Sequence, residues 1–269
     1  MNSLQPEFVD SHVHLDLVYA YRSDRIEWLR QIGCLPISWA FSRYVGSVAD
    51  LKVNLNAQQK AIHTIRSTGL ECFYLTGVHP RNIPPDLVPE KIADILAPFL
   101  EDPVCLGIGE IGLEFGGQQE KEILAAQLSM APEVSRRKKI LGLHTPRNDK
   151  QQITQEILSV LEDFQPWCSS IVVDHCLPET IEAVLKQGFW AGITLSPVKA
   201  SHEDLDQIIK HHPEYVNRML LNTDSGSKFN EDLYRLYLSK SYPDDIQMQL
   251  FRENALQFFG LMHLNNPQL

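Results

Sequence analysis

The chain has 269 residues, of which 43% are hydrophobic, and its formal net charge is −10 at pH 7. This length and hydrophobic content suffice for one large core, whereas the net negative charge excludes nonspecific binding of nucleic acid over the whole surface. The five cysteines show no CxxC spacing, the amino terminus resembles no leader peptide, and no stretch is long enough to span a membrane. We therefore expect a cytoplasmic protein with reduced thiols and no membrane contact, in which any polyanionic substrate needs a local basic patch or a bound metal.

Short apolar runs alternate along the chain with longer amphipathic segments. Strands are predicted at residues 8–17, 34–41, 71–78, 104–111, 140–144, 170–175, 189–195 and 218–223. Helices are predicted at residues 23–31, 47–68, 89–100, 118–134, 151–164, 179–187 and 201–211, with one or two closing helices within 230–261. The segment 47–68 is typical, because Leu51, Leu55 and Ile62 share one helical face and Gly69 follows its end.

The order of these segments predicts the fold class. Eight strand-then-helix units, with strands rich in Val, Ile and Leu, favour an α/β protein with a (β/α)8 TIM barrel. An open doubly wound sheet with a dinucleotide site would carry a GxGxxG turn after the first strand, and the sequence has none there. Because no linker, repeat or low-complexity segment interrupts the chain, we expect residues 1–269 to form a single domain.

The first strand carries an unusual polar pattern. The stretch 8–17, FVDSHVHLDL, places His12 and His14 two residues apart. Alternate residues of a strand share a face, so both imidazoles are expected to point the same way, roughly 7 Å apart. Two neutral imidazoles at a strand end form half of a site for a divalent cation. The alternative is that one histidine caps a turn and the other is solvated.

Further polar residues follow the other predicted strands. In a (β/α)8 barrel the functional site lies at the carboxyl ends of the strands. Seven histidine and carboxylate side chains fall there, namely His12, His14, His79, Glu110, His144, His175 and Asp224. Any one of them could be an ordinary polar residue at the rim, but together they predict a metal site.

These motifs resemble those of the TatD family of metal-dependent deoxyribonucleases, within the amidohydrolase superfamily. The matching segments are DSHVHLD at 10–16, GVHP at 77–80, GIGEIGLEF at 107–115, QLSMA at 127–131, LHTPR at 143–147, DHC at 174–176 and NTDS at 222–225. The resemblance covers nearly the whole chain and implies two divalent metal ions, of Mg, Zn or Mn. It implies one ion held by His12, His14, Glu110 and Asp224, and a second held by bridging Glu110 with His144 and His175.

The resemblance also implies an activity, namely hydrolysis of phosphodiesters as an exonuclease on single-stranded DNA or frayed ends. Two ions roughly 3.5–4 Å apart can activate a shared water and stabilise the oxygens entering and leaving in an in-line displacement. Asp224, Glu110 and His79 are the expected catalytic residues: Asp224 orients or deprotonates the water, Glu110 bridges the ions, and His79 contacts the substrate phosphate.

Basic and aromatic residues near the strand ends could bind the substrate. Arg81 and Arg147, together with Lys199 and Lys228, follow strand ends closely enough to surround the barrel mouth. Four aromatic residues on the same side could stack on unpaired bases: Trp39, Phe41, Tyr44 and Phe115. The alternatives are ordinary surface charges for the basic residues and core positions for Trp39 and Phe41.

Several residues depart from the family pattern without removing an expected metal ligand. Glu114 stands where the family commonly has Asp, Asn222 stands where it usually has Glu, and HCLPE at 175–179 replaces HCFSG. These changes leave two other functions open. One is a metal-dependent hydrolase of a small ester, lactone or amide, and the other is a metal-binding subunit of a larger assembly with a protein partner.

Overall fold

The chain forms a nearly closed (β/α)8 barrel, as the order of its sequence segments predicted. A computed structural model describes residues 5–41 and 44–265. Its eight parallel strands pair in chain order, from β1 to β8. They are β1 Phe8–Val13, β2 Cys34–Ser38, β3 Phe73–Thr76, β4 Cys105–Gly112, β5 Ile140–His144, β6 Ile171–Val173, β7 Trp190–Thr194 and β8 Met219–Asn222. The first and last strands meet where the amide of His14 donates to the Ser225 carbonyl at 2.7 Å.

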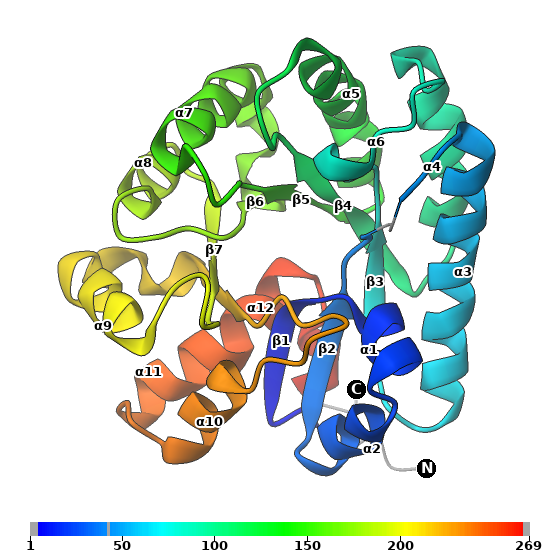
Figure 1. The fold of residues 1–269 in the computed structure, drawn as a ribbon. Coiled ribbons are helices and arrows are strands. Elements are labelled where there is room, and N and C mark those ends of the chain that lie inside the picture. The colour runs from blue at the N-terminus through cyan, green and yellow to red at the C-terminus, as the bar shows by residue number, and fades with distance from the viewer. Residues whose placement is uncertain (1–4, 42–43, 266–269) are drawn as a thin grey trace.

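Helices surround the strands on the outside of the barrel (Figure 1). They are α1 Leu15–Tyr21, α2 Asp24–Gln31, α3 Val48–Ser67, α4 Ile92–Leu100, α5 Gln118–Leu128, α6 Ala131–Arg136, α7 Lys150–Leu161, α8 Ile181–Lys186, α9 His202–His211, α10 Asp232–Ser239, α11 Asp244–Met248 and α12 Asn254–Phe258. Over the described ranges, no helix has the length and apolar character needed to cross a bilayer.

Two predicted elements are wrong in detail. The stretch 8–17 is a strand only as far as Val13, and helix α1 begins at Leu15, so His14 lies in the turn between them. The helix predicted at 118–134 is two helices, α5 and α6, with Pro132 in the first turn of the second. Proline has no N–H to donate to the preceding turn, so a separate helix starts there.

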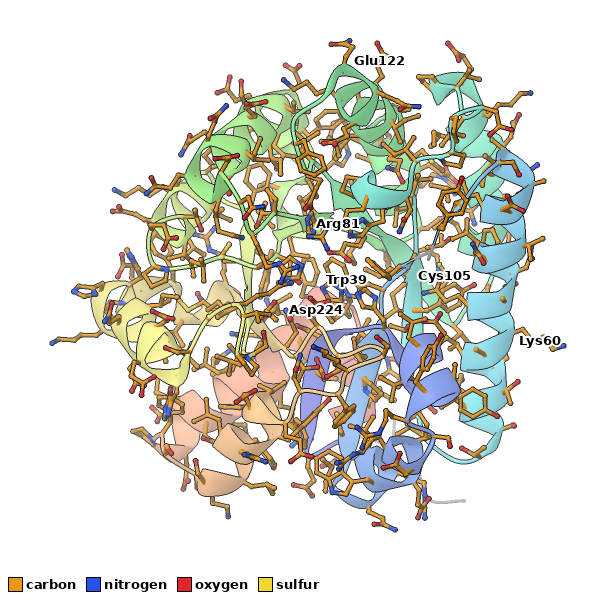
Figure 2. All side chains as sticks on the ribbon, in the orientation of Figure 1. Trp39, Lys60, Arg81, Cys105, Glu122 and Asp224 are labelled. Carbon is orange, nitrogen blue, oxygen red and sulfur yellow. The ribbon has the colours of Figure 1, made fainter. Side chains whose placement is uncertain are left out.

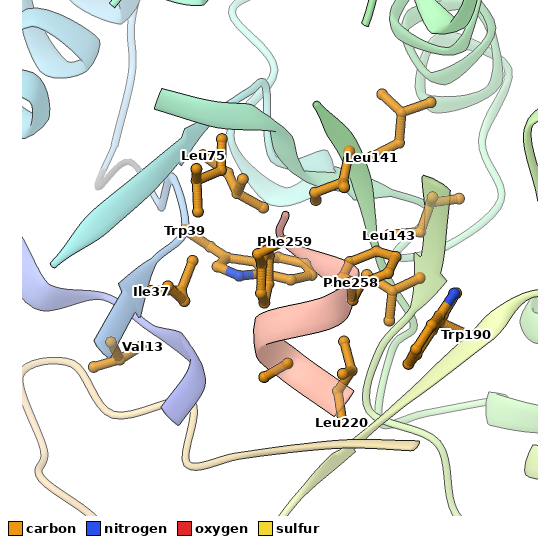
Figure 3. Close-up of a cluster of buried hydrophobic side chains, with 14 of the residues drawn as sticks. Val13, Ile37, Trp39, Leu75, Leu141, Leu143, Trp190, Leu220, Phe258 and Phe259 are labelled. Carbon is orange, nitrogen blue, oxygen red and sulfur yellow. The ribbon is translucent and has the colours of Figure 1, made fainter. Parts of the chain in front are cut away.

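The barrel is filled by apolar side chains from the strands and from the end of α12. Leu75 and Leu220 come from two strands and are each at most 1% exposed. Figure 3 shows them in one cluster with Phe258 and Phe259. The ring of Phe258 lies 5.1 Å from that of Trp190, between centroids. This packed interior gives the strand ends a rigid base on which polar side chains can be held in fixed positions.

Candidate metal centre

All seven polar side chains predicted at the strand ends meet at one end of the barrel. Five of the six predicted metal ligands line a cavity of about 420 Å³, and His79 lines it with them. The sixth ligand, His12, is fully buried directly beneath. Figure 2 shows Trp39, Arg81 and Asp224 near the centre of the ring of strands, whereas Lys60 and Glu122 lie at the outer edge of the molecule, on helices α3 and α5. The geometry therefore gathers residues that are up to about 210 positions apart in the sequence, but their role as ligands stays a prediction.

Glu110, near the end of β4, occupies the centre of this cluster and is 1% exposed. Its Oε2 lies 3.5 Å from Nε2 of His12 and 3.4 Å from Nε2 of His79. Its Oε1 lies 2.7 Å from Nδ1 of His144 and 3.1 Å from Nε2 of His175. Burial opposes ionisation, but the surrounding histidines hold the pKa of Glu110 well below its usual range. The two oxygens of one carboxylate thus face two separate groups of histidines.

Asp224 lies just beyond β8 with a φ of 50°, in the left-handed region that non-glycine residues rarely adopt. Its amide donates to the carbonyl oxygen of His12 at 3.0 Å, which holds it beside β1. Its Oδ1 lies 3.0 Å from Nε2 of His14, and its Oδ2 lies 2.5 Å from Nζ of Lys199. Burial opposes ionisation, but Lys199 and His14 hold the pKa of Asp224 well below its usual range. A charged oxygen therefore faces the cluster.

The side chain of His12 shows that these residues fit a cation. Its Nδ1 donates to Oδ2 of Asp174 at 2.5 Å, whereas its Nε2 is buried and has no hydrogen-bond partner among the described residues. Such orphaned buried nitrogens are rare. Burial disfavours a charged ring, but Glu110 and Asp174 outweigh it and raise the pKa of His12 to about 10. The surroundings of Nε2 therefore favour positive charge, which a divalent cation bound by imidazole and carboxylate groups supplies.

His79 differs from the other histidines in the nitrogen that carries its proton. Its Nδ1 accepts a hydrogen bond from the amide of Arg81 at 3.0 Å, so the neutral ring has its proton on Nε2. Burial lowers the pKa of His79 to about 4, which keeps the ring neutral. Nε2 faces Oε2 of Glu110 at 3.4 Å. His79 thus presents an N–H donor to the cavity, and this suits a contact to an anionic oxygen better than a bond to a metal.

Two carboxylates beside the histidines were not assigned a role from the sequence. Glu114 accepts from Nε2 of His144 at 2.8 Å and pairs with Nε of Arg81 at 2.9 Å. Burial opposes ionisation, but these two partners lower the pKa of Glu114 to about 2. Asp174 holds His12, and its position directly before His175 in the DHC motif was the only sequence signal for it.

The predicted basic residues all line the cavity, whereas one of the four predicted aromatic residues, Phe41, does so. Arg81, Arg147, Lys199 and Lys228 surround the mouth, and Phe41 lies among them. The stacking role considered for Trp39 is wrong, because its side chain is 1% exposed. Its ring lies under His12, with centroids 4.1 Å apart and planes 11° from parallel. Tyr44 and Phe115 are exposed, and their contact with a substrate stays a prediction.

Known proteins are similar in sequence to most of this chain. The family model described as TatD related DNase matches residues 9–230. An uncharacterized metal-dependent hydrolase of Methanocaldococcus jannaschii is 31% identical over 244 residues, which cover 88% of this chain and 91% of that protein. The 3'-5' ssDNA/RNA exonuclease TatD of Edwardsiella piscicida is 27% identical over 191 residues, which cover 67% of this chain and 68% of that protein.

A solved structure is also similar to this chain. The crystal structure of a TatD-like protein from Archaeoglobus fulgidus aligns with a TM-score of 0.76 and 26% identity, covering 94% of this chain and 100% of that one. The family model spans most of the barrel strands, and the Methanocaldococcus relative matches along nearly its whole length. The chain belongs to the TatD related DNase family, as its motifs predicted.

Proposed function

We propose that this chain is a divalent-metal-dependent hydrolase that cleaves phosphodiesters, as an exonuclease on single-stranded DNA or frayed ends. The observation that carries the proposal is the placement of Glu110, whose two oxygens face different histidines. A carboxylate in this position suits a bridge between two cations. The similarity to the 3'-5' ssDNA/RNA exonuclease TatD of Edwardsiella piscicida supports the choice of substrate.

The residues divide into two ligand groups around Glu110. The first consists of His12, His14 and Asp224 on the side of Oε2, and all four residues can place a ligand atom within 4.8 Å of one another. The second consists of His144 and His175 on the side of Oε1. Divalent ions held by these groups supply positive charge opposite a phosphodiester and lower the pKa of a water molecule.

The chain's own residues then perform distinct tasks. Asp224 keeps Oδ1 toward the cluster and can orient or deprotonate the attacking water, while Lys199 holds Oδ2. His79 can donate a hydrogen bond from its Nε2–H group to a phosphate oxygen. Arg147 is exposed at the mouth and can bind a neighbouring phosphate of the strand. Such local positive charge is what a chain with a net charge of −10 needs in order to bind DNA.

The test is hydrolysis of end-labelled single-stranded and blunt duplex DNA by the chelator-treated chain, with Mg²⁺, Mn²⁺ or Zn²⁺ added back. We expect metal-dependent release of nucleotides from one end, faster on the single strand. Glu110→Gln is the matched control, because it keeps the size of the side chain and removes its charge. The proposal fails if no divalent ion binds, or if Glu110→Gln hydrolyses DNA at the wild-type rate.

A second function, hydrolysis of a small ester, lactone or amide, is favoured by the size of the cavity. Its volume of about 420 Å³ falls within the roughly 300–1,000 Å³ of small-molecule sites. A panel of such compounds with the same added metals distinguishes the two, because turnover of a small substrate without turnover of DNA would favour this alternative.

A further inference from the structure

A buried carboxylate links the histidines of the two proposed ligand groups. Asp174 directly follows β6 and is 1% exposed. Its Oδ2 accepts the hydrogen bond from Nδ1 of His12, at 2.5 Å. Its Oδ1 accepts from the amide of His175 at 2.7 Å and from Nδ2 of Asn222 at 2.8 Å. Both oxygens are therefore satisfied, as a buried charge requires.

The hydrogen bonds continue from Asn222 to the ring of His175. Because Nδ2 of Asn222 donates to Asp174, its Oδ1 is the acceptor for the hydroxyl of Thr194, at 2.7 Å. Nδ1 of His175 lies 2.7 Å from this hydroxyl oxygen and 2.9 Å from Nζ of Lys199. Nε2 of the same ring lies 3.1 Å from Oε1 of Glu110. Asp174 thus holds His12 directly, and the contacts through Asn222 and Thr194 reach the ring of His175.

The neighbouring strand leaves room for this carboxylate. Gly192 lies in β7, and a Cβ atom added there would stand 2.0 Å from Oδ1 of Asp174. No other residue can occupy this position without displacing the Asp174 side chain. The backbone of β7 and the hydrogen bonds of Asp174 therefore point independently to the same placement of the carboxylate.

We propose that Asp174 is a positioning residue for the metal centre, which orients His12 directly and His175 through Asn222 and Thr194. The inference rests on the proposed function, since it concerns how tightly that site holds its ions. A carboxylate on the far nitrogen of a ligating histidine fixes the ring and makes it a stronger ligand. Asp174 would therefore set metal affinity although it does not itself face the cavity.

The experiment measures Zn²⁺ affinity of the chelator-treated chain by competition with a chromophoric chelator. Asp174→Asn keeps the size of the side chain, and we expect it to weaken Zn²⁺ binding by about 10–100-fold, the range typical of such residues. Asp102→Asn is the matched control. Asp102 also binds a histidine, His63, at 2.7 Å, but it precedes β4 and so lies at the opposite end of the barrel. Its variant should bind Zn²⁺ as the wild type does.

Thr194→Val provides a second variant that conserves volume, in case Asp174→Asn does not fold. It breaks only the link to His175, and we expect weaker binding of the second Zn²⁺ equivalent with the first unchanged. Wild-type Zn²⁺ affinity in both Asp174→Asn and Thr194→Val overturns the inference. An equal loss of Zn²⁺ affinity in Asp102→Asn also overturns it, because any loss of a buried carboxylate would then weaken binding. A wild-type chain that binds no divalent ion would overturn the proposed function itself, so the two failures are distinguishable.

Discussion

Nδ1 of His14 donates a hydrogen bond to the main-chain carbonyl of Trp39, at 3.0 Å. Because a carbonyl oxygen only accepts, Nδ1 carries the proton, and Nε2 presents its lone pair to Glu110 and Asp224. The indole of Trp39 also stacks on His12 and donates through Nε1 to the carbonyl of Ser11 at 2.8 Å. Trp39 therefore supports both His12, in β1, and His14, just after it, from beneath the cavity.

The first prediction concerns the space that holds this indole. A Cβ atom added at Gly142 would lie 2.3 Å from Cη2 of Trp39. Gly142→Ala should lower the free energy of unfolding by about 1–3 kcal/mol, the usual cost of overpacking, and should weaken Zn²⁺ binding by shifting Trp39. Urea denaturation and a Zn²⁺ titration measure the two effects. Gly117→Ala is the control, because nothing lies within 4 Å of its added Cβ. Equal stability of the two variants would contradict the prediction.

The strands and most helices could be predicted because their apolar residues repeat with the period of each element. Helix α1 could not be predicted, because the alternation of His12, His14 and Asp16 continues the pattern of a strand past the residue where the chain turns. The predicted ligands were found because they lie at the ends of five different strands, β1, β4, β5, β6 and β8. Asp174 was missed because its partner His12 lies 162 positions away, and no local pattern marks that pairing.

The second prediction concerns removal of the metal. A ligand that binds only the folded chain stabilises it, by about 2.7 kcal/mol at a concentration one hundred times its Kd. Treatment with a chelator should therefore lower the melting temperature, and Zn²⁺ or Mn²⁺ should restore it. Glu110→Gln, which removes the central charge, should respond much less to either addition. A melting temperature of the wild type that is the same with chelator and with excess metal would contradict a metal site among these residues.

The third prediction compares two arginines at the cavity mouth. Arg147 is exposed there, whereas Nε of Arg81 lies 2.9 Å from a carboxylate oxygen of Glu114. Arg147→Ala should weaken binding of single-stranded DNA and reduce the slope of log affinity against log salt by about 0.7 per lost phosphate contact. Arg81→Ala should change that slope less, because Glu114 already partly neutralises the charge of Arg81.

Fluorescence anisotropy at several salt concentrations measures both effects on the metal-loaded chain. Arg136→Ala is a suitable control, since Arg136 lies on the outer helix α6 and pairs with Glu133 there. Its variant should bind as the wild type does. If Arg147→Ala keeps both the affinity and the salt slope of the wild type, the DNA does not pass over this side of the mouth.

The last prediction concerns Asp224. Asn has nearly the same size and can still turn a carbonyl oxygen toward His14, so Asp224→Asn should fold normally. It has no charge with which to accept a proton from water, and general-base catalysis typically contributes about 10²–10⁴-fold, so hydrolysis should fall by that range. Lys199 loses its anionic partner at 2.5 Å and becomes available to a phosphate, so substrate should bind as tightly as before or more tightly.

Steady-state hydrolysis and DNA binding must be measured at saturating metal, because the group formed by His12, His14 and Asp224 holds its ion less firmly once the charge is gone. A large fall in kcat with unchanged or tighter binding assigns Asp224 to the chemical step, since an interaction lost only in the ground state would raise KM instead. Turnover near the wild-type value under these conditions would restrict Asp224 to a structural role. The proton of the attacking water would then have to leave by another path.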